Sequence, residues 1–190
     1  MFTLFPYTTL FRSEAPRDYL RYIIAEVQGD TLVISTRRGF VGGPVRRAVF
    51  TIGVKDLEAV SLAGAGAIKI FALETDSLDV NLSGAGSIEI DDLNAKRLNV
   101  NLSSAGAIII AGNVEKQDVN ISGVGSYEAG DLETEDTEVL MSGAGSAVVW
   151  AQEDLEVEVS GVGTVTYFGN PSIYQNITGL GSVNSRGDRD

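Results

Sequence analysis

The stretch LDVNLSGAGSIEI, residues 78–90, joins a β-strand pattern to a glycine-rich corner. Leu78, Val80 and Leu82 alternate with polar residues, and Ile88 and Ile90 flank a glutamate. Alternation of apolar and polar residues is typical of a strand with one buried face. The stretch therefore predicts two short strands separated by a turn at Ser-Gly-Ala-Gly.

The same phrase returns along the chain as LAGAGAI, LSGAGSI, LSSAGAI, ISGVGSY, MSGAGSA, VSGVGTV and ITGLGSV, at intervals of 18 to 20 residues. A repeat of this length indicates a solenoid. One coil of about 20 residues cannot bury its own apolar face, whereas coils stacked about 4.8 Å apart can. We therefore predict an all-β fold, a parallel β-helix of about seven coils of 18–20 residues over residues 61–185.

Single positions within the copies have predicted roles. A sharp corner stacked on identical corners needs either a positive φ or the space that a Cβ would fill. The third copy has Ser104 in place of the first glycine but keeps the second, so we expect the second to matter more. Tyr127 and Tyr167 stand at inward positions and are predicted to fill the core. The second glycines, predicted to be structural, are Gly66, Gly86, Gly106, Gly125, Gly145, Gly163 and Gly181.

Three segments flank the repeats. Residues 14–60 contain alternating stretches and are predicted to form an irregular N-terminal β cap. Residues 186–190 are polar and are expected to be a frayed tail. Residues 3–13, TLFPYTTLFRS, resemble the translation of a common sequencing adapter and lack the features of a secretory signal. We interpret residues 1–13 as an adapter-derived artefact, so the true N-terminus and any export signal are expected to be missing.

Composition limits the chemistry. The 190-residue chain has no cysteine and no histidine, so thiolates and the commonest general base and metal ligand are absent. No apolar run approaches the length that spans a bilayer. Residues 15–60 carry seven Lys/Arg and five Asp/Glu, whereas residues 61–185 carry four and 18. The acidic repeats make a nucleic-acid partner unexpected, and no cofactor is expected.

Two outward columns of the coils are candidate ligand-binding strips. The first is an amide column of Asn81, Asn101, Asn120 and Asn176. It would offer a polysaccharide a platform of hydrogen-bonding groups, although asparagines stacked in this way also bond to one another, and the residues alone favour this structural role. The second is an acidic column of Asp79, Asp118, Glu138 and Glu156. Its oxygens would suit Ca²⁺, but we predict a solvated face that limits aggregation, and no metal site.

The tandem S-G-A-G-S-I units, preceded by TIGVKDLEAVSLAGAG at residues 51–66, resemble the autotransporter adhesin head-domain family, also called the head GIN domain. The resemblance extends over residues 24–185. It implies a right-handed parallel β-helix, export to the bacterial cell envelope and an adhesin-like role. It brings no catalytic or binding residues to transfer.

Three functions fit the sequence. The leading interpretation is a non-enzymatic, exported binding module whose side contacts a surface polysaccharide or an envelope protein. The second is a structural envelope spacer or a homo-oligomer-forming rod. The third is a polysaccharide-active β-helix enzyme, which needs acids beside Arg or Lys in a groove built by long loops. The corners are short in every copy and basic residues are few, so the sequence disfavours the enzyme.

Overall fold

The computed structural model describes residues 2–4, 10–14, 21–37 and 48–189. The elements in these ranges are all β-strands, which confirms the predicted all-β class. The chain divides into two compact units, Met1–Ala59 and Val60–Asp190. The second unit holds the repeats.

Antiparallel strands make up the N-terminal unit. β3 and β4 form a hairpin in which Gln28 pairs with Thr31, and Gly29 takes a φ of 62° in the turn, a value that suits glycine. β1 also pairs with β4, and β2 pairs with β5. Since β1 and most of β2 lie in the adapter-like stretch, strand pairing occurs there too, and the origin of the stretch stays a prediction. The bounds are β1 Phe2–Leu4, β2 Leu10–Glu14, β3 Ile23–Gln28, β4 Thr31–Thr36 and β5 Val49–Gly53.

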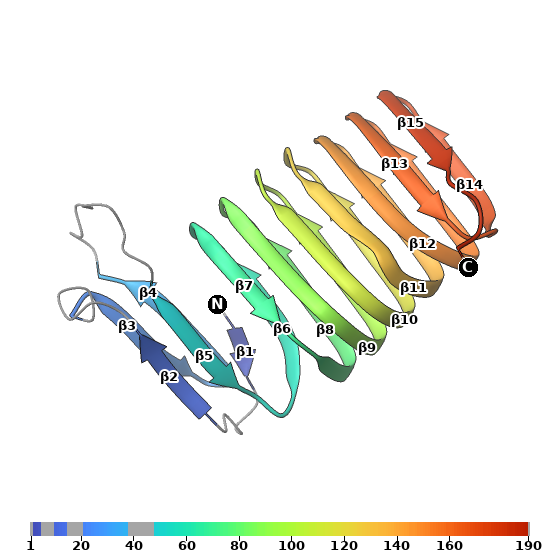
Figure 1. Cartoon of the computed structure of the whole chain (residues 1–190). Coiled ribbons are helices and arrows are strands. Elements are labelled where there is room, and N and C mark those ends of the chain that lie inside the picture. Colours follow the sequence, from blue (N-terminus) through green and yellow to red (C-terminus); the bar gives the residue numbers. More distant parts are fainter. Residues whose placement is uncertain (1, 5–9, 15–20, 38–47, 190) are drawn as a thin grey trace. The chain divides into compact units, whose positions relative to one another are not determined.

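The second unit is a stack of coils whose strands run parallel (Figure 1). β8 pairs with β9, β9 with β10, β10 with β11 and β11 with β12. The last coils split into two strands each, so that β12 pairs with both β13 and β14, and β13 pairs with β15. This arrangement is a β-solenoid of about seven turns, as the repeat predicts. The bounds are β6 Leu57–Leu62, β7 Gly66–Ile70, β8 Leu73–Leu82, β9 Gly86–Leu102, β10 Ala107–Ile121, β11 Ser126–Met141, β12 Ala144–Val159, β13 Val162–Phe168, β14 Ser172–Ile177 and β15 Leu180–Ser185.

The glycine corners stack directly on one another. Gly66 pairs with Gly86, and Gly163 pairs with both Gly145 and Gly181. None of the seven second glycines has a positive φ. A Cβ on Gly106 would lie 2.5 Å from the Gly86 carbonyl oxygen and 2.8 Å from Leu82 Cδ2. Space, and not backbone conformation, therefore explains the six second glycines from Gly86 onward, each of which stacks on a preceding corner.

The first glycine of the corner is as tightly packed as the second, which the sequence did not indicate. A Cβ on Gly84 would lie 2.7 Å from the carbonyl carbon of Ala63. Most copies donate two backbone amides to one carbonyl of the preceding coil, as Ser122 and Gly123 do to Leu102. At Ser104 the side-chain Oγ makes the second bond, 3.3 Å from the Leu82 oxygen. The serine hydroxyl thus replaces an amide donor at this corner.

Inward positions of the strands form continuous apolar columns. One column contains Leu78 and Leu98, and another contains Val80 and Val100, and all four are almost fully buried. Removing such side chains from water is the main favourable term for a fold whose single coils have no core.

Tyr127 is fully buried, as predicted, in the column of Ile88 and Ile108. The next residue of that column is Ala147, whose small side chain leaves room for the phenol. Tyr167 is also inward in register, paired with buried Val149, but it is only half-buried.

A buried hydrogen-bond network lies within the core. Tyr127 Oη donates to Gln117 Oε1 at 2.8 Å, and Gln117 Nε2 donates to Thr137 Oγ1 at 3.0 Å. Thr134 Oγ1 lies 2.6 Å from Thr137 Oγ1 and donates to the Trp150 carbonyl at 2.7 Å. A one-residue slip between coils would leave these groups unpaired, which costs more than the bonds contribute when made. The network therefore helps to specify the register of β10, β11 and β12.

Residues 186–189 of the C-terminal tail are not frayed, which corrects the expectation from the sequence for this part of the tail. Arg186 N donates to the Tyr167 oxygen, and Gly169 N donates to the Gly187 oxygen, which extends the parallel ladder beyond β15. Gly169 has a φ of 95° at this point. Arg189 then pairs with Asp131 at 2.5 Å. Backbone pairing and a charged contact hold the segment, although its composition alone resembles that of a free end.

Gly106→Ala should destabilise the solenoid by about 1 to 3 kcal/mol, because the added methyl collides with backbone of the coil below. Ser104→Ala should cost less, about 1 kcal/mol, since it removes one hydrogen bond. Gly66→Ala is the matched control, because among the described residues its Cβ would meet only Leu62 Cδ1, at 3.9 Å. Thermal and urea unfolding of the three variants would measure the order. Equal stability of Gly106→Ala and Ser104→Ala would refute the steric account of the corners.

The buried phenol predicts a loss of stability at alkaline pH. Burial raises the pKa of Tyr127 above its usual range. The neutral phenol therefore makes its full contribution to the free energy of unfolding below about pH 10. As the pH rises further, that free energy falls by about 1.4 kcal/mol per pH unit. Tyr127→Phe should cost about 1 kcal/mol at neutral pH, because Gln117 loses a donor, yet flatten the decline above pH 10. Urea unfolding of both proteins across this pH range would measure the difference, and parallel pH profiles would contradict the prediction.

Candidate functional site

The structure places both predicted strips in register along one outer side of the coils. Asn101 pairs with Asn81 and Asn120, and Asp118 pairs with Asn99 and Glu138. The columns lie two residues apart on each strand, so both point outward while the residue between them points inward. Glu156 and Asn176 continue the columns into β12 and β14.

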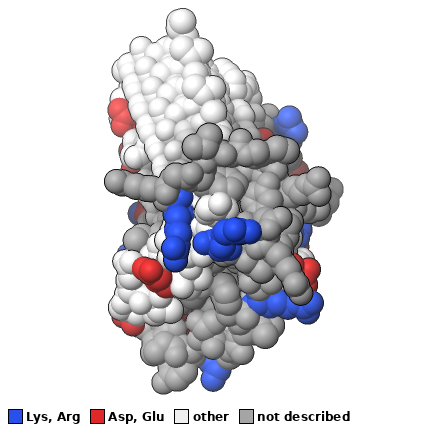
Figure 2. Space-filling model, turned by 90° about the vertical axis from the view of Figure 1, so that its left-hand side faces the viewer, with Lys and Arg blue, Asp and Glu red and all other residues white. Residues whose placement is uncertain are grey.

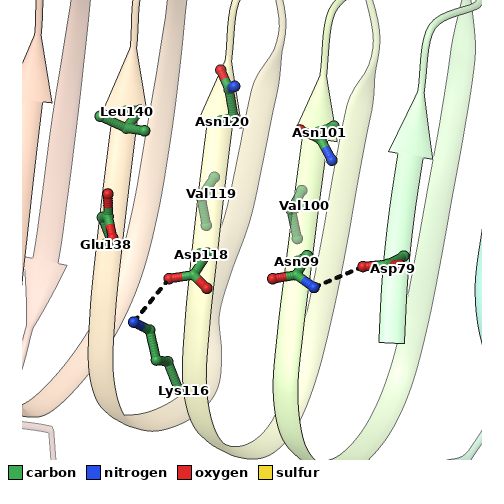
Figure 3. Close-up of a pocket in the computed structure, with 10 residues that line it drawn as sticks. All are labelled: Asp79, Asn99, Val100, Asn101, Lys116, Asp118, Val119, Asn120, Glu138 and Leu140. Atoms are coloured by element: carbon green, nitrogen blue, oxygen red, sulfur yellow. Dashed lines mark hydrogen bonds and ion pairs between the residues drawn. The ribbon is translucent and has the colours of Figure 1, made fainter. Parts of the chain in front are cut away.

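The central part of the two columns lines a shallow groove of about 470 Å³, which we call the side groove (Figure 3). Asp79, Asn99, Asp118 and Glu138 lie in one row across four neighbouring coils in Figure 3. A second row contains Asn101, Asn120 and Leu140, and Lys116 lies on the other side of the acids. Glu156 and Asn176 share the columns but do not line the groove.

The amide column is only partly satisfied by its own side chains. Asn101 Nδ2 donates to Asn81 Oδ1 at 3.1 Å. Asn120 is exposed and forms no side-chain hydrogen bond with another described residue, and its next neighbour in the column is the exposed Leu140. The ladder of stacked amides therefore forms at one end of the groove and stops. Asn120 retains two donors and one acceptor that point to solvent.

The acidic column combines charged and neutral partners. Asn99 Nδ2 donates to Asp79 Oδ1 at 2.7 Å, which separates this acid from the next one. Lys116 Nζ lies 3.4 Å from Asp118 Oδ1. That oxygen is screened from solvent and accepts no hydrogen bond from a described residue, so the lysine charge is its main compensation. An adjacent cation offsets part of the repulsion that stacked carboxylates impose on one another.

Among the described residues, no three carboxylates come together in an arrangement that would hold a metal ion. This statement includes Asp118, Glu138 and Glu156, which follow one another in the column. Other carboxylates on the solenoid pair with lysines of adjacent coils. Lys69 donates to Glu89 and Asp91, and hydrogen bonds to these two carboxylates raise its pKa.

Basic residues are more frequent in the N-terminal unit, as the sequence shows. Figure 2 views the molecule from the left-hand side of Figure 1 and shows blue Lys and Arg side chains near the centre of that face. Arg17, Arg38, Arg46 and Arg47 lie outside the described residues. Within the described part of the chain, no helix is long and apolar enough to cross a membrane.

The sequence did not predict that arginines of the C-terminal tail lie over aromatic rings of the last coils. The Arg189 guanidinium lies 4.9 Å from the centre of the Phe168 ring and 5.8 Å from that of Trp150. Arg186 lies 5.9 Å from the centre of the same Phe168 ring. The tail thus covers these aromatic rings with cations, an arrangement with favourable ring–cation attraction. The repeat register predicts that Trp150 pairs with Phe168. The repeat pattern does not predict that Arg186 and Arg189 contact these rings, because the two arginines lie outside the repeats.

The model of the family described as "Putative auto-transporter adhesin, head GIN domain" matches residues 12–171. The chain belongs to this family. A search of curated proteins finds no match to this chain.

Solved structures share the solenoid. A crystal structure named as a putative adhesin from Bacteroides fragilis is 28% identical, with a TM-score of 0.89, over 92% of this chain and 81% of that one. A structure named as a putative lipid binding protein from Parabacteroides distasonis is 23% identical, with a TM-score of 0.72, over 88% and 80% of the two chains. A third structure, named as a putative adhesin from Parabacteroides merdae, is 16% identical, with a TM-score of 0.66, over 92% of this head GIN domain chain and 82% of that one. The last two likenesses show the fold alone.

Asn99→Asp tests how the acidic column is kept stable. The change removes the bond to Asp79 and places a third carboxylate between Asp79 and Asp118, so we expect a loss of about 1 to 2 kcal/mol at neutral pH. The loss should shrink in high salt, which screens exposed charges. Asn101→Asp is the control, because it also removes one amide bond but has asparagines on both sides. Urea unfolding at two salt concentrations would measure both variants. A salt-independent loss, equal in the two, would contradict the electrostatic account.

Proposed function

We propose that this chain is a non-enzymatic, adhesin-like binding module of the bacterial cell envelope, and that the side groove is its contact surface for a surface polysaccharide. The family description and the adhesin named among the solved structures support the adhesin-like class and an extracellular or envelope location. The groove is the observation that carries the finer proposal.

The chemistry of the groove suits sugar hydroxyl groups. Carboxylates such as Asp79 and Glu138 accept hydrogen bonds, and the Asn120 amide both donates and accepts them. These groups repeat from coil to coil at the strand spacing of about 4.8 Å, so an extended polymer meets similar groups along its length. The net charge of -12 disfavours an acidic polymer. Neutral or amino-substituted polysaccharides are therefore the ligand class that we propose.

The alternative of a polysaccharide-active enzyme receives less support from the same groove. Its acids Asp79, Asp118 and Glu138 share the surface with one lysine, Lys116. The corners next to it are short turns and not long loops that would enclose a substrate. Release of reducing ends from a bound polysaccharide would favour the enzyme over the binding module.

The test is binding to an array of neutral and amino-substituted bacterial and host glycans. The Asn101→Ala/Asn120→Ala double variant should reduce binding of any captured glycan by about tenfold or more, the equivalent of one or two lost polar contacts. The Asn94→Ala/Asn113→Ala double variant is the matched control, since both asparagines are exposed and neither lines the groove. Equal affinity of the two double variants would exclude the side groove as the contact surface.

A further inference from the structure

The last coil of the solenoid differs in charge from every coil before it. No Asp, Glu, Lys or Arg lies between Glu158 and Arg186. The register shows what has been replaced, because Ser172, Tyr174 and Asn176 of β14 pair with Asp154, Glu156 and Glu158 of β12. Three acids of one coil therefore become three neutral residues in the next.

The neutral coil also has open strand edges. β14 pairs with β12 and β15 pairs with β13, and no described strand pairs with the far edge of either. Soluble proteins usually protect such edges with charged side chains, prolines within the strand or bulges. Neither β14 nor β15 contains a charged residue or a proline. Their free amides and carbonyls are thus available to another strand.

The apolar columns end unfinished at this edge. Ile173 and Ile177 are 40% and 39% exposed, whereas Leu155 and Val159, one coil earlier in the same columns, are 1% and 0% exposed. Leu180 is 81% exposed at the last corner. One more layer of strands would complete the burial of both isoleucines.

We propose that this layer is the same edge of a second copy, in an end-to-end dimer formed by antiparallel pairing of β14 and β15 with their counterparts. A two-fold axis brings identical edges together, and two strand edges of this kind are complementary to each other. Charge favours a second copy at this place. Two chains of net charge -12 repel over their acidic sides, and the last coil is where that repulsion is weakest.

The dimer does not depend on polysaccharide binding by the side groove. It adds one consequence for that function, because two grooves on one particle would bind a polymer with higher avidity than one.

Sedimentation equilibrium of the full chain over a wide concentration range is the test. The wild-type chain should reach twice its single-chain mass of 20.1 kDa. Tyr174→Lys/Asn176→Lys should remain monomeric, because lysine on a strand edge opposes pairing. This variant should still fold, since the new lysines lie beside Glu156 and Glu158 of its own chain. Asn94→Lys/Asn113→Lys adds the same charge in central coils and should dimerise like the wild type.

A second measurement does not depend on any variant. Hydrogen exchange of the wild-type amides in β14 and β15 should slow as protein concentration rises, whereas exchange in β9 and β10 should not change. A wild-type chain that stays monomeric at every concentration overturns the proposal, as does a Tyr174→Lys/Asn176→Lys variant that dimerises normally. Masses that keep growing beyond a dimer would indicate head-to-tail filaments and would also overturn the two-fold arrangement.

Discussion

The whole solenoid depends on how closely one glycine corner approaches the next. The carbonyl oxygen of Gly86 occupies the space that a Cβ of Gly106 would need, and the same contact recurs between Gly106 and Gly125. Strands on both sides of a corner can pair at hydrogen-bonding distance only if the corners themselves stack this tightly. The glycines thus allow the ladder, and the ladder in turn buries the apolar columns that stabilise it.

Exact stacking turns each position of the repeat into a column on the surface. A polar residue chosen once, such as asparagine at the outer position, is presented again at each coil, which creates an extended surface without any loop. The same rule imposes a constraint, because like charges in one column face each other at the strand spacing. Two residues reduce this repulsion in the acidic column. Asn99 separates Asp79 from Asp118, and Lys116 lies beside Asp118. The side groove is therefore as much a product of stacking as the core is.

The length of the repeat and the alternation of inward and outward residues were enough to predict which residues share a column. The registers of Asn101 and Asp118 confirm those assignments. They were not enough to predict contacts across the interior, because these depend on how far a side chain reaches within the coil. Gln117 stands in a leucine column, a departure visible in the repeat, but its bond to Tyr127 needs the structure. The sequence likewise did not predict the contact of Arg189 with the Phe168 ring, since the tail lies outside the repeats. The functional role of the groove remains a proposal, since no residue pattern identifies a ligand.

The last described coil of the solenoid differs in chemistry from the coils before it. In the central coils, outward acids keep the chain soluble while the ladder satisfies both edges of every strand. On the last coil the same positions are neutral, and inward Gln175 replaces the valine of the preceding coil. An edge that faces only water would be expected to keep the acids, because on its open side they face no further carboxylates. Their replacement by Ser172, Tyr174 and Asn176, beside two half-exposed isoleucines, is better explained by an edge that meets another protein surface than by one that meets solvent.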